Sequence, residues 1–405
     1  MARPENVQAL FLTLTGSCNL SCSYCFEDDK NSSKMLWDTA KKSLDWALSA
    51  TNPVEIVFYG GEPLMEFPMI QKAVAYVNER VGPEHQILFG LVTNGLLMRR
   101  EVLDFLDEHR FSIQLSFDGV PSAQLERGKG TWDILDNLIT QLPTTHPKLF
   151  SDLTVNITAF PSTIRHLSAS VDYFLEKRVI GFGISPVFTD SSSWQVSDIE
   201  VLREQFQSIY ESSLRHYEEH HCTPFGGFQK ADPTSPHAPD GYKMCGVSRG
   251  EKPTIDTDGR VHACATFTDS IQTRPEGILK DSLDQVDLGS LHDEGFRSNF
   301  ESLEEKFEGI EIFDGKESKY SSYAKCNNCQ YLSRCSVCPV SIGHIPGNTD
   351  PNRIPDFFCA FNLVIHAYGD QFRDAISPRR AFGWKPASES PGLRAIAASS
   401  SLRRK

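Results

Sequence analysis

Eleven cysteines are the residues of this 405-residue chain best suited to chemistry, because thiolates bind metals and carry redox reactions. Cys18, Cys22 and Cys25 lie together in the spacing Cys-x3-Cys-x2-Cys. Three thiolates on one short loop can bind three irons of a cubane iron–sulfur cluster and leave the fourth iron without a protein ligand. A zinc site normally needs a fourth ligand, and the adjacent residues offer none that is obviously suited. The spacing therefore predicts an iron–sulfur cluster with one open iron.

The other eight cysteines lie in the C-terminal half, and four of them form the run Cys326-x2-Cys329-x5-Cys335-x2-Cys338. Two Cys-x2-Cys pairs are typical of iron–sulfur sites and also of zinc ribbons, so this spacing leaves both alternatives open. An odd cysteine count without a visible export signal argues against a disulfide framework. We therefore expect metal chemistry in a reducing, cytoplasmic compartment.

The elements that must position these cysteines follow from hydrophobic periodicity. In the first 190 residues, short apolar runs alternate with segments whose apolar residues recur at helical spacing. We expect strands at 7–14, 55–59, 87–93, 111–117, 153–159 and 183–188. We expect helices at 36–48, 69–81, 99–108, 131–142, 163–178 and 199–220. Strands separated by helices pair in parallel, which predicts an α/β fold: a partial (β/α)6 TIM-like barrel with chemistry in the loops after its strands.

Composition divides the chain into a barrel at 1–220, a linker at 221–244, a cysteine-rich domain at 245–378 and a tail at 379–405. The linker is rich in Pro, Gly, Ser and Asp. The cysteine-rich domain reads as irregular, with a hairpin at 256–259 before Val261. The tail is small, polar and finally basic, which predicts a flexible segment.

The run Cys18-Asn-Leu-Ser-Cys22-Ser-Tyr-Cys25 resembles the signature of radical S-adenosylmethionine (SAM) enzymes. In that family SAM chelates the open iron of a [4Fe-4S] cluster through its amino and carboxylate groups. One electron from the reduced cluster cleaves SAM into methionine and a 5′-deoxyadenosyl radical. The radical removes a hydrogen atom from an unactivated carbon, which no protein side chain can do. The resemblance covers residues 7–190 and implies SAM as a cofactor.

Further motifs at successive strand ends are similar to the SAM-binding segments of the family. Gly60-Gly61-Glu62-Pro63 resembles its Gly-Gly-Glu-Pro motif, in which glycines allow close backbone approach and the carboxylate suits an ammonium. An ordinary turn after a strand is the alternative for Gly-Gly. The resemblance implies a SAM-binding set that consists of Tyr24, Gly60, Gly61, Glu62, Pro63, Asn94, Ser116, Arg127 and Val187.

The resemblance gives roles to several of these residues. Ser116, in the Ser-x-Asp-Gly motif, would contact SAM, and Tyr24 would pack near the adenine. Asn94 would line the pocket and Val187 would flank the adenosine. Arg127 would pair with the SAM carboxylate, with a solvated surface arginine as the alternative.

The C-terminal cysteines resemble the SPASM extension of radical SAM enzymes, which holds two auxiliary iron–sulfur clusters. Carried over by order, the first auxiliary cluster would be bound by Cys245, Cys264 and Cys338. The second would be bound by Cys326, Cys329, Cys335 and Cys359. With the N-terminal cluster, this implies three [4Fe-4S] clusters per chain, two of them in a C-terminal auxiliary-cluster domain.

Two departures from the SPASM pattern concern the auxiliary clusters. Cys335 and Cys338 enclose two residues where the family usually has three. An eighth cysteine, which some relatives place shortly after the first, is missing from 246–253. The first auxiliary cluster therefore has either an open iron or another ligand such as Cys222, for which a free thiol is the alternative.

The charge balance excludes other partner classes. A formal net charge of −13 argues against nucleic acid and against an anionic membrane, and no apolar run is long enough to span a bilayer.

The SPASM-bearing branch mostly modifies peptides and proteins. We expect an oxidoreductase that crosslinks a ribosomally made precursor peptide through a thioether or carbon–carbon bond. Its partners would be that peptide and an electron donor such as flavodoxin or ferredoxin. Because 17 residues precede Cys18, we also expect that the leader is bound by a separate leader-binding protein or by the C-terminal region.

Two alternatives to this function remain. In the sulfatase-maturating, formylglycine-forming group, an aspartate that acts as a base follows the cysteine in the place of Cys264, where this chain has Ala265. The alternative of another class is a non-catalytic electron carrier or peptide-binding protein, which has no use for a SAM pocket. The sequence identifies neither the catalytic base nor the bond that is formed.

Overall fold

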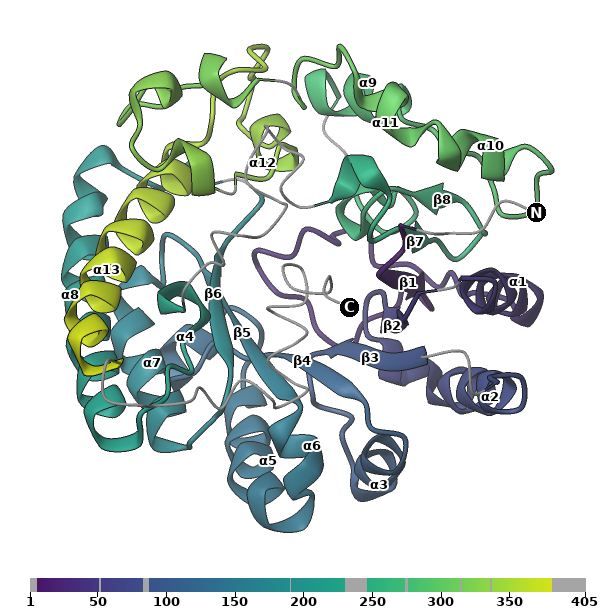
Figure 1. The fold of residues 1–405 in the computed structure, drawn as a ribbon, viewed down its shortest axis with the longest axis horizontal. Coiled ribbons are helices and arrows are strands. Elements are labelled where there is room, and N and C mark those ends of the chain that lie inside the picture. The colour runs from purple at the N-terminus through teal and green to yellow at the C-terminus, as the bar shows by residue number, and fades with distance from the viewer. Residues whose placement is uncertain are drawn as a thin grey trace.

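A single sheet with parallel strands organises the parts of the chain that the structure, a computed structural model, describes (Figure 1). These parts are residues 6–50, 52–82, 87–189, 191–229, 246–273, 276–313, 315–335 and 337–380. The strands of the barrel are β1 (Ala9–Thr13), β2 (Val54–Tyr59), β3 (Ile87–Thr93), β4 (Ser112–Ser116), β5 (Leu153–Ala159) and β6 (Phe182–Pro186). They pair in sequence order and in parallel, which confirms the expected partial barrel.

Helices cover the outside of this sheet, since each carries apolar residues at helical spacing on one face. They are α1 (Trp37–Leu48), α2 (Phe67–Asn78), α3 (Arg100–Glu108), α4 (Pro121–Gln124), α5 (Thr131–Thr145), α6 (Pro147–Ser151), α7 (Leu167–Glu176) and α8 (Ile199–His220). In α3, for example, Val102, Leu103 and Leu106 are buried. The helix expected at 69–81 begins earlier because Pro68 is accommodated in its first turn.

Aromatic side chains fill much of the core between sheet and helices. Phe58 and Phe111 are fully buried, and their rings stack with centroids 6.0 Å apart. Phe89 joins them at 5.5 Å from Phe111. Phenylalanine therefore contributes to the core.

The sheet continues beyond the barrel into the cysteine-rich region. Two short strands, β7 (Thr254–Ile255) and β8 (Val261–His262), form the expected hairpin. β7 pairs in parallel with β1, with Phe11 opposite Thr254. The cysteine-rich region is therefore joined to the N-terminal strand of the barrel by a common sheet.

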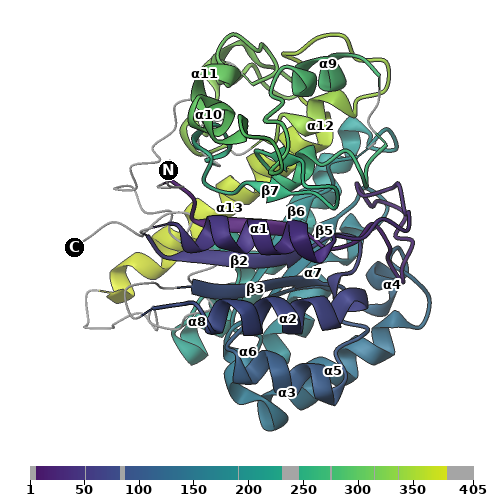
Figure 2. The ribbon, with the colours of Figure 1, turned by 90° about the vertical axis from the view of Figure 1, so that its right-hand side faces the viewer.

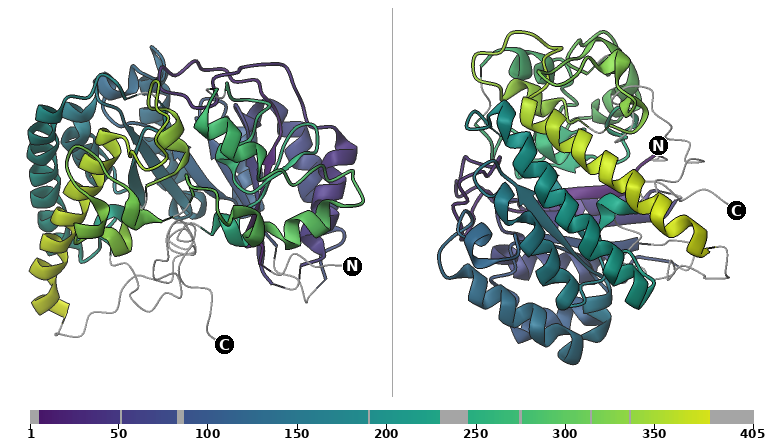
Figure 3. Two further views of the ribbon diagram at one scale, coloured as in Figure 1. Left: turned by 90° about the horizontal axis from the view of Figure 1, so that it is seen from above. Right: turned by 90° about the vertical axis from the view of Figure 1, so that its left-hand side faces the viewer.

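The remaining C-terminal elements lie over the β1 side of the barrel and along its outside (Figure 2). They are α9 (Ile278–Asp284), α10 (Phe296–Glu301), α11 (Leu303–Phe307), α12 (Val340–Gly343) and α13 (Asp356–Arg380). The helix α13 runs side by side with α8 (Figure 3, right). None of the helices in the described parts of the chain is long and apolar enough to cross a bilayer.

The domain boundaries expected from composition stay predictions. Part of the expected linker, 221–229, is described, and Phe225 within it forms a bridge to Phe182 of β6. The rest of the linker lies outside the described residues, as do Cys245 and the tail beyond Arg380.

Candidate iron–sulfur and SAM site

The three N-terminal cysteines lie in the loop that follows β1, and each is half-buried. Burial raises the pKa of all three thiols, that of Cys22 to about 11, and the Cys22 thiol also interacts with those of Cys18 and Cys25. Cations oppose this effect: Lys30 Nζ lies 3.4 Å from Cys25 Sγ, and the charge of Arg127 lowers the pKa of Cys22. Three soft donors gathered in one place beside cations are the donor set that fits an iron–sulfur cluster.

The loop that carries the cysteines packs closely against the backbone of Gly60 and Gly61. Gly60 has a φ of 123°, and its Cβ would come within 3.0 Å of the Thr15 carbonyl oxygen. A Cβ on Gly61 would come equally close to the Ser17 carbonyl oxygen. The Gly61 N–H donates to Thr15 O at 2.9 Å, so the two segments touch through their backbones. Glycine is therefore required here by close approach.

We expect Gly61→Ala to weaken cluster binding, because Ser17, next to Cys18, must move. Overpacking of this kind costs about 1–3 kcal/mol, which would weaken cluster binding by about 5- to 150-fold if the whole cost falls on the cluster loop, and SAM cleavage should fall with the cluster content. Iron content and 5′-deoxyadenosine formation check it. The matched control is Gly183→Ala in β6, where an added Cβ meets nothing within 4 Å. An equal loss of iron and of 5′-deoxyadenosine in both variants would show that close packing at Gly61 is not needed for cluster binding.

Glu62 joins two loops of the barrel next to the cysteine loop. Its carboxylate is fully buried and accepts hydrogen bonds from Thr93 Oγ1 at 2.8 Å, Asn94 N at 2.8 Å and Leu64 N at 3.1 Å. These bonds join the loops after β2 and β3, and the contact of Glu62 with the ammonium of SAM stays a prediction. The side chain of Asn94 lies 3.8 Å from Cys18 Sγ, at the cluster loop.

A buried ion pair lies beside the same loop. Arg127 Nε and Nη2 donate to the two oxygens of Asp118 at 3.0 and 2.9 Å, and the Tyr24 hydroxyl also donates to Asp118. Thr158 N donates to Asp118 Oδ1 at 2.9 Å. Arg127 is 8% exposed, so the alternative of a solvated surface arginine is wrong.

Asp118 is the residue of this group that sequence reasoning did not select. It stands inside the Ser-x-Asp-Gly motif, which was the available signal. Its contacts hold the Tyr24 ring and the Arg127 guanidinium, both of which are expected to face SAM. The guanidinium lies 5.4 Å from the centroid of the Tyr24 ring. The roles of Tyr24 and Arg127 toward SAM stay predictions.

The other expected SAM-binding residues lie at strand ends or next to them. Ser116 ends β4 half-buried, opposite Asn156 of β5. Pro63 opens a short 3-10 helix after β2. Val187 is buried and donates its N–H to Ala159 O at 3.0 Å, continuing the pairing of β5 and β6. Their contacts with SAM remain predictions.

Four of the C-terminal cysteines line one cavity, namely Cys326, Cys329, Cys335 and Cys359. Burial raises the pKa of the Cys335 thiol to about 12 and that of Cys359 to about 11, and each of these two thiols also interacts with Cys326 and Cys329. This is the group that the sequence assigns to the second auxiliary cluster. A cavity with four thiols around it fits a [4Fe-4S] cluster.

The first auxiliary group is less complete in the described residues, because Cys245 lies outside them. Cys264 packs against the main core, and Cys338 packs against both this core and a small one around Phe358. Cys222 follows α8, and its Sγ lies 3.4 Å from His216 Nε2. This contact favours a free Cys222 thiol, and the ligand set of the first cluster stays a prediction.

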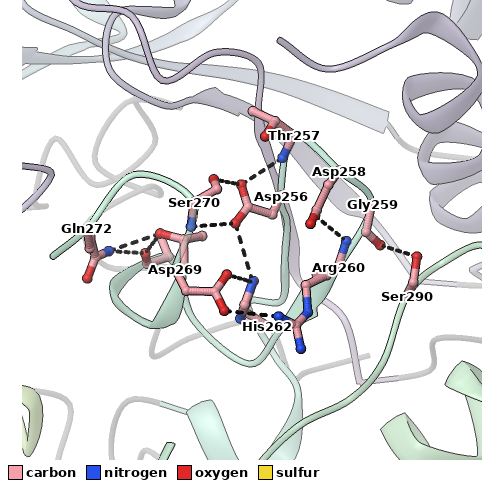
Figure 4. Close-up of polar contacts among 12 residues, drawn as sticks. Asp256, Thr257, Asp258, Gly259, Arg260, His262, Asp269, Ser270, Gln272 and Ser290 are labelled. Carbon is pink, nitrogen blue, oxygen red and sulfur yellow. Dashed lines mark hydrogen bonds and ion pairs between the residues drawn. The ribbon is translucent and has the colours of Figure 1, made fainter. Parts of the chain in front are cut away.

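A polar network holds the hairpin that leads to Cys264 (Figure 4). Asp256 is fully buried; Ser270 Oγ donates to it, and His262 Nε2 lies 3.5 Å from its Oδ2. Burial raises the pKa of Asp256, but the hydrogen bonds from His262 and Ser270 outweigh it and leave that pKa below its ordinary value. Asn31 Nδ2 donates to Ser270 O at 2.5 Å, which ties the N-terminal cysteine loop to this hairpin.

The chain's matches to known proteins agree with this arrangement. Residues 12–168 match the model of the Radical SAM superfamily, and this part of the chain is a radical SAM domain. An uncharacterized protein of Methanocaldococcus jannaschii is 34% identical over 116 residues, which are 29% of this chain and 40% of that protein. The radical SAM cyclopropyl synthase TigE of Paramaledivibacter caminithermalis is 27% identical over 157 residues, 34% of this chain and 32% of TigE. The chain thus spans less than half of the length of either relative.

Two solved structures share the fold over most of the chain. The sulfatase maturase anSMEcpe, with bound AdoMet and the Kp18Cys peptide, has a TM-score of 0.67 at 16% identity, covering 92% of this chain and 99% of its own. SuiB of Streptococcus suis, bound to its precursor peptide SuiA, has a TM-score of 0.53 at 15% identity, covering 87% and 76%. At these identities the likeness is one of fold.

Proposed function

We propose that this protein is a radical SAM oxidoreductase that crosslinks a ribosomally made precursor peptide through a thioether or carbon–carbon bond. The observation that carries the proposal is the pairing of two thiol sets in one chain. A three-thiol loop packs against Gly60 and Gly61, and a separate cavity is lined by four thiols. An electron carrier needs no loop with an open ligand position. The likeness in fold to SuiB and anSMEcpe, both solved with peptides, supports a peptide substrate.

The residues of the chain would divide the work of this reaction. Cys18, Cys22 and Cys25 would hold the cluster to which SAM binds, and Lys30 and Arg127 lie where they offset the charge of the thiolates. When bound, the cluster and SAM supply a 5′-deoxyadenosyl radical that removes a hydrogen atom from the peptide.

The other groups would shape the pocket and hold the auxiliary clusters. Asp118 holds Tyr24 and Arg127 in place, and these two residues would line the SAM pocket. The four cysteines of the C-terminal cavity would hold the second auxiliary cluster. We propose an electron donor such as flavodoxin or ferredoxin and a separate leader-binding protein as further partners.

Formylglycine formation in a sulfatase is the second candidate, favoured by the higher TM-score of anSMEcpe, 0.67 against 0.53 for SuiB. Ala265, which opens a short 3-10 helix directly after Cys264, stands where that group has its base. The position therefore supplies no carboxylate. This absence favours the crosslinking peptide maturase.

Reconstitution under anaerobic conditions tests the proposal. We expect about twelve irons per chain, since the cysteine sets suit three four-iron clusters. With SAM and a reductant, the cysteine-containing peptide encoded next to this protein should lose two hydrogens, seen as a two-dalton loss by mass spectrometry. Its cysteine-to-alanine variant is the control for a thioether. Formylglycine in a sulfatase peptide, with the precursor left unchanged, would overturn the substrate assignment.

A further inference from the structure

Two buried lysines line the cavity of the four C-terminal cysteines. Lys316 is 6% exposed and Lys319 is 1% exposed. Lys316 Nζ donates to the carbonyl oxygen of Cys335, and Lys319 Nζ donates to Glu311 O at 3.3 Å and to Pro351 O at 3.1 Å. Lysine is rarely buried to this extent, because removing an ammonium from water is costly. Both lysines therefore lie where their positive charge can act on a negatively charged group inside the cavity.

The backbone fixes both lysines to the cysteines. Lys316 opens the 3-10 helix Lys316–Ser318, and in such a helix residues three apart lie on the same side, as Lys316 and Lys319 do. Cys326 N then donates to Lys319 O at 2.9 Å. The ammonium groups are therefore held beside the thiols by short-range backbone contacts.

Their charges act on the thiols of the cavity. Burial is the larger effect and raises the pKa of Cys335 and of Cys326, whereas the charge of Lys316 opposes it at both thiols. Lys319 acts in the same direction on Cys326. A cation fixed at the cavity wall stabilises an electron added inside the cavity, because the added charge is negative and the site is poorly solvated.

We propose that Lys316 and Lys319 raise the reduction potential of the cluster held in this cavity. The inference rests on the proposed function, which places an auxiliary cluster there. A [4Fe-4S] cluster with four thiolates is an anion, and reduction adds one electron and one further negative charge. In turnover that electron comes from the oxidised peptide, and in a titration it comes from dithionite. Two fixed cations favour the reduced form, so a cluster in this cavity accepts electrons more readily.

A redox titration followed by electron paramagnetic resonance tests the proposal in a background with Cys18, Cys22 and Cys25 changed to alanine. That background removes the signal of the N-terminal cluster. We expect Lys316→Met to make reduction of one couple about tenfold less favourable, which is about 59 mV for one electron. Lys316→Arg, which keeps the charge, should leave the potential near that of the parent.

The matched control is Lys325→Met, because Lys325 is exposed beside Cys326 and its charge is screened by water. Equal shifts in Lys316→Met and Lys325→Met, or no shift in either, would overturn the proposal. Iron analysis of a variant with Cys326, Cys329 and Cys335 all changed to alanine, in the same background, separates the two levels of inference. Unchanged iron content would show that the cavity holds no cluster, whereas SAM cleavage by the chain with Cys18, Cys22 and Cys25 intact tests the proposed activity by itself. Lys319→Met should shift the potential in the same direction as Lys316→Met. If Lys319→Met does not fold, Lys316→Met alone decides the outcome.

Discussion

Cys22→Ala is expected to lower 5′-deoxyadenosine formation by on the order of 10³-fold or more. The reason is that no protein side chain can supply the electron that the cluster transfers to SAM. Cys22 is the thiol that interacts with both other cysteines of the loop and with Arg127. Without it, two thiols remain to hold the cluster. Chromatographic quantification of 5′-deoxyadenosine after anaerobic incubation with SAM and dithionite measures the effect.

Two further cysteine variants give this experiment its controls. Cys222→Ala should retain SAM cleavage, since Cys222 lies beside His216 at the end of α8. Cys335→Ala should keep some SAM cleavage but lose the peptide product, because Cys335 lines the separate C-terminal cavity. Equal loss of 5′-deoxyadenosine in Cys22→Ala and Cys335→Ala would contradict a division of labour between the two sites.

Asp118→Asn is expected to lower the free energy of unfolding by about 3–5 kcal/mol, the usual cost of leaving one partner of a buried ion pair without its counter-charge. The side chains of Arg127 and Asp118 are 8% and 2% exposed, so water cannot replace the lost carboxylate. Denaturant unfolding under anaerobic conditions measures the change. SAM cleavage should fall as well, because the Tyr24 hydroxyl donates to the same carboxylate.

The matched control is Glu200→Gln, which removes an exposed partner of Arg203 at 2.7 Å. We expect a change of at most about 1 kcal/mol there, because solvent screens exposed pairs. The double variant Asp118→Leu with Arg127→Met should recover much of the lost stability, since no buried charge is left unpaired. Equal destabilisation by Asp118→Asn and Glu200→Gln would show that the ion pair is not a stabilising element.

Local sequence patterns were sufficient to predict the six barrel strands and most of the helices around them. Strand and helix periodicities differ, and they are encoded within windows of ten to twenty residues. The strands β3 and β5 have the bounds expected at 87–93 and 153–159. The helix expected at 163–178 is shorter, because its start is a 3-10 turn, Ile164–His166, before α7. Terminal turns depend on contacts that periodicity does not record.

Spacing along the chain likewise predicted the N-terminal cysteine set, whereas the C-terminal set followed from the resemblance to SPASM proteins. Cys18, Cys22 and Cys25 share one loop, and three of the four cysteines around the C-terminal cavity lie within ten residues of one another. The fourth, Cys359, reaches the cavity from α13, and only the resemblance to SPASM proteins pointed to it. Ligand types and short spacings are visible in sequence because the chemistry of a metal site restricts both.

Only the tertiary structure decided which partners the charged side chains have. Glu62 bonds to the loop after β3 and Arg127 pairs with Asp118, two contacts that the sequence did not predict. The pairing of β7 with β1 and the two lysines beside the C-terminal thiols had no sequence signal either. β7 has two residues, too few for a period, and a buried lysine cannot be told from a solvated one by its neighbours in the chain. Burial and charge pairing are set by segments that meet across the fold, so they are fixed only when the sheet closes and the cysteine-rich region packs on it.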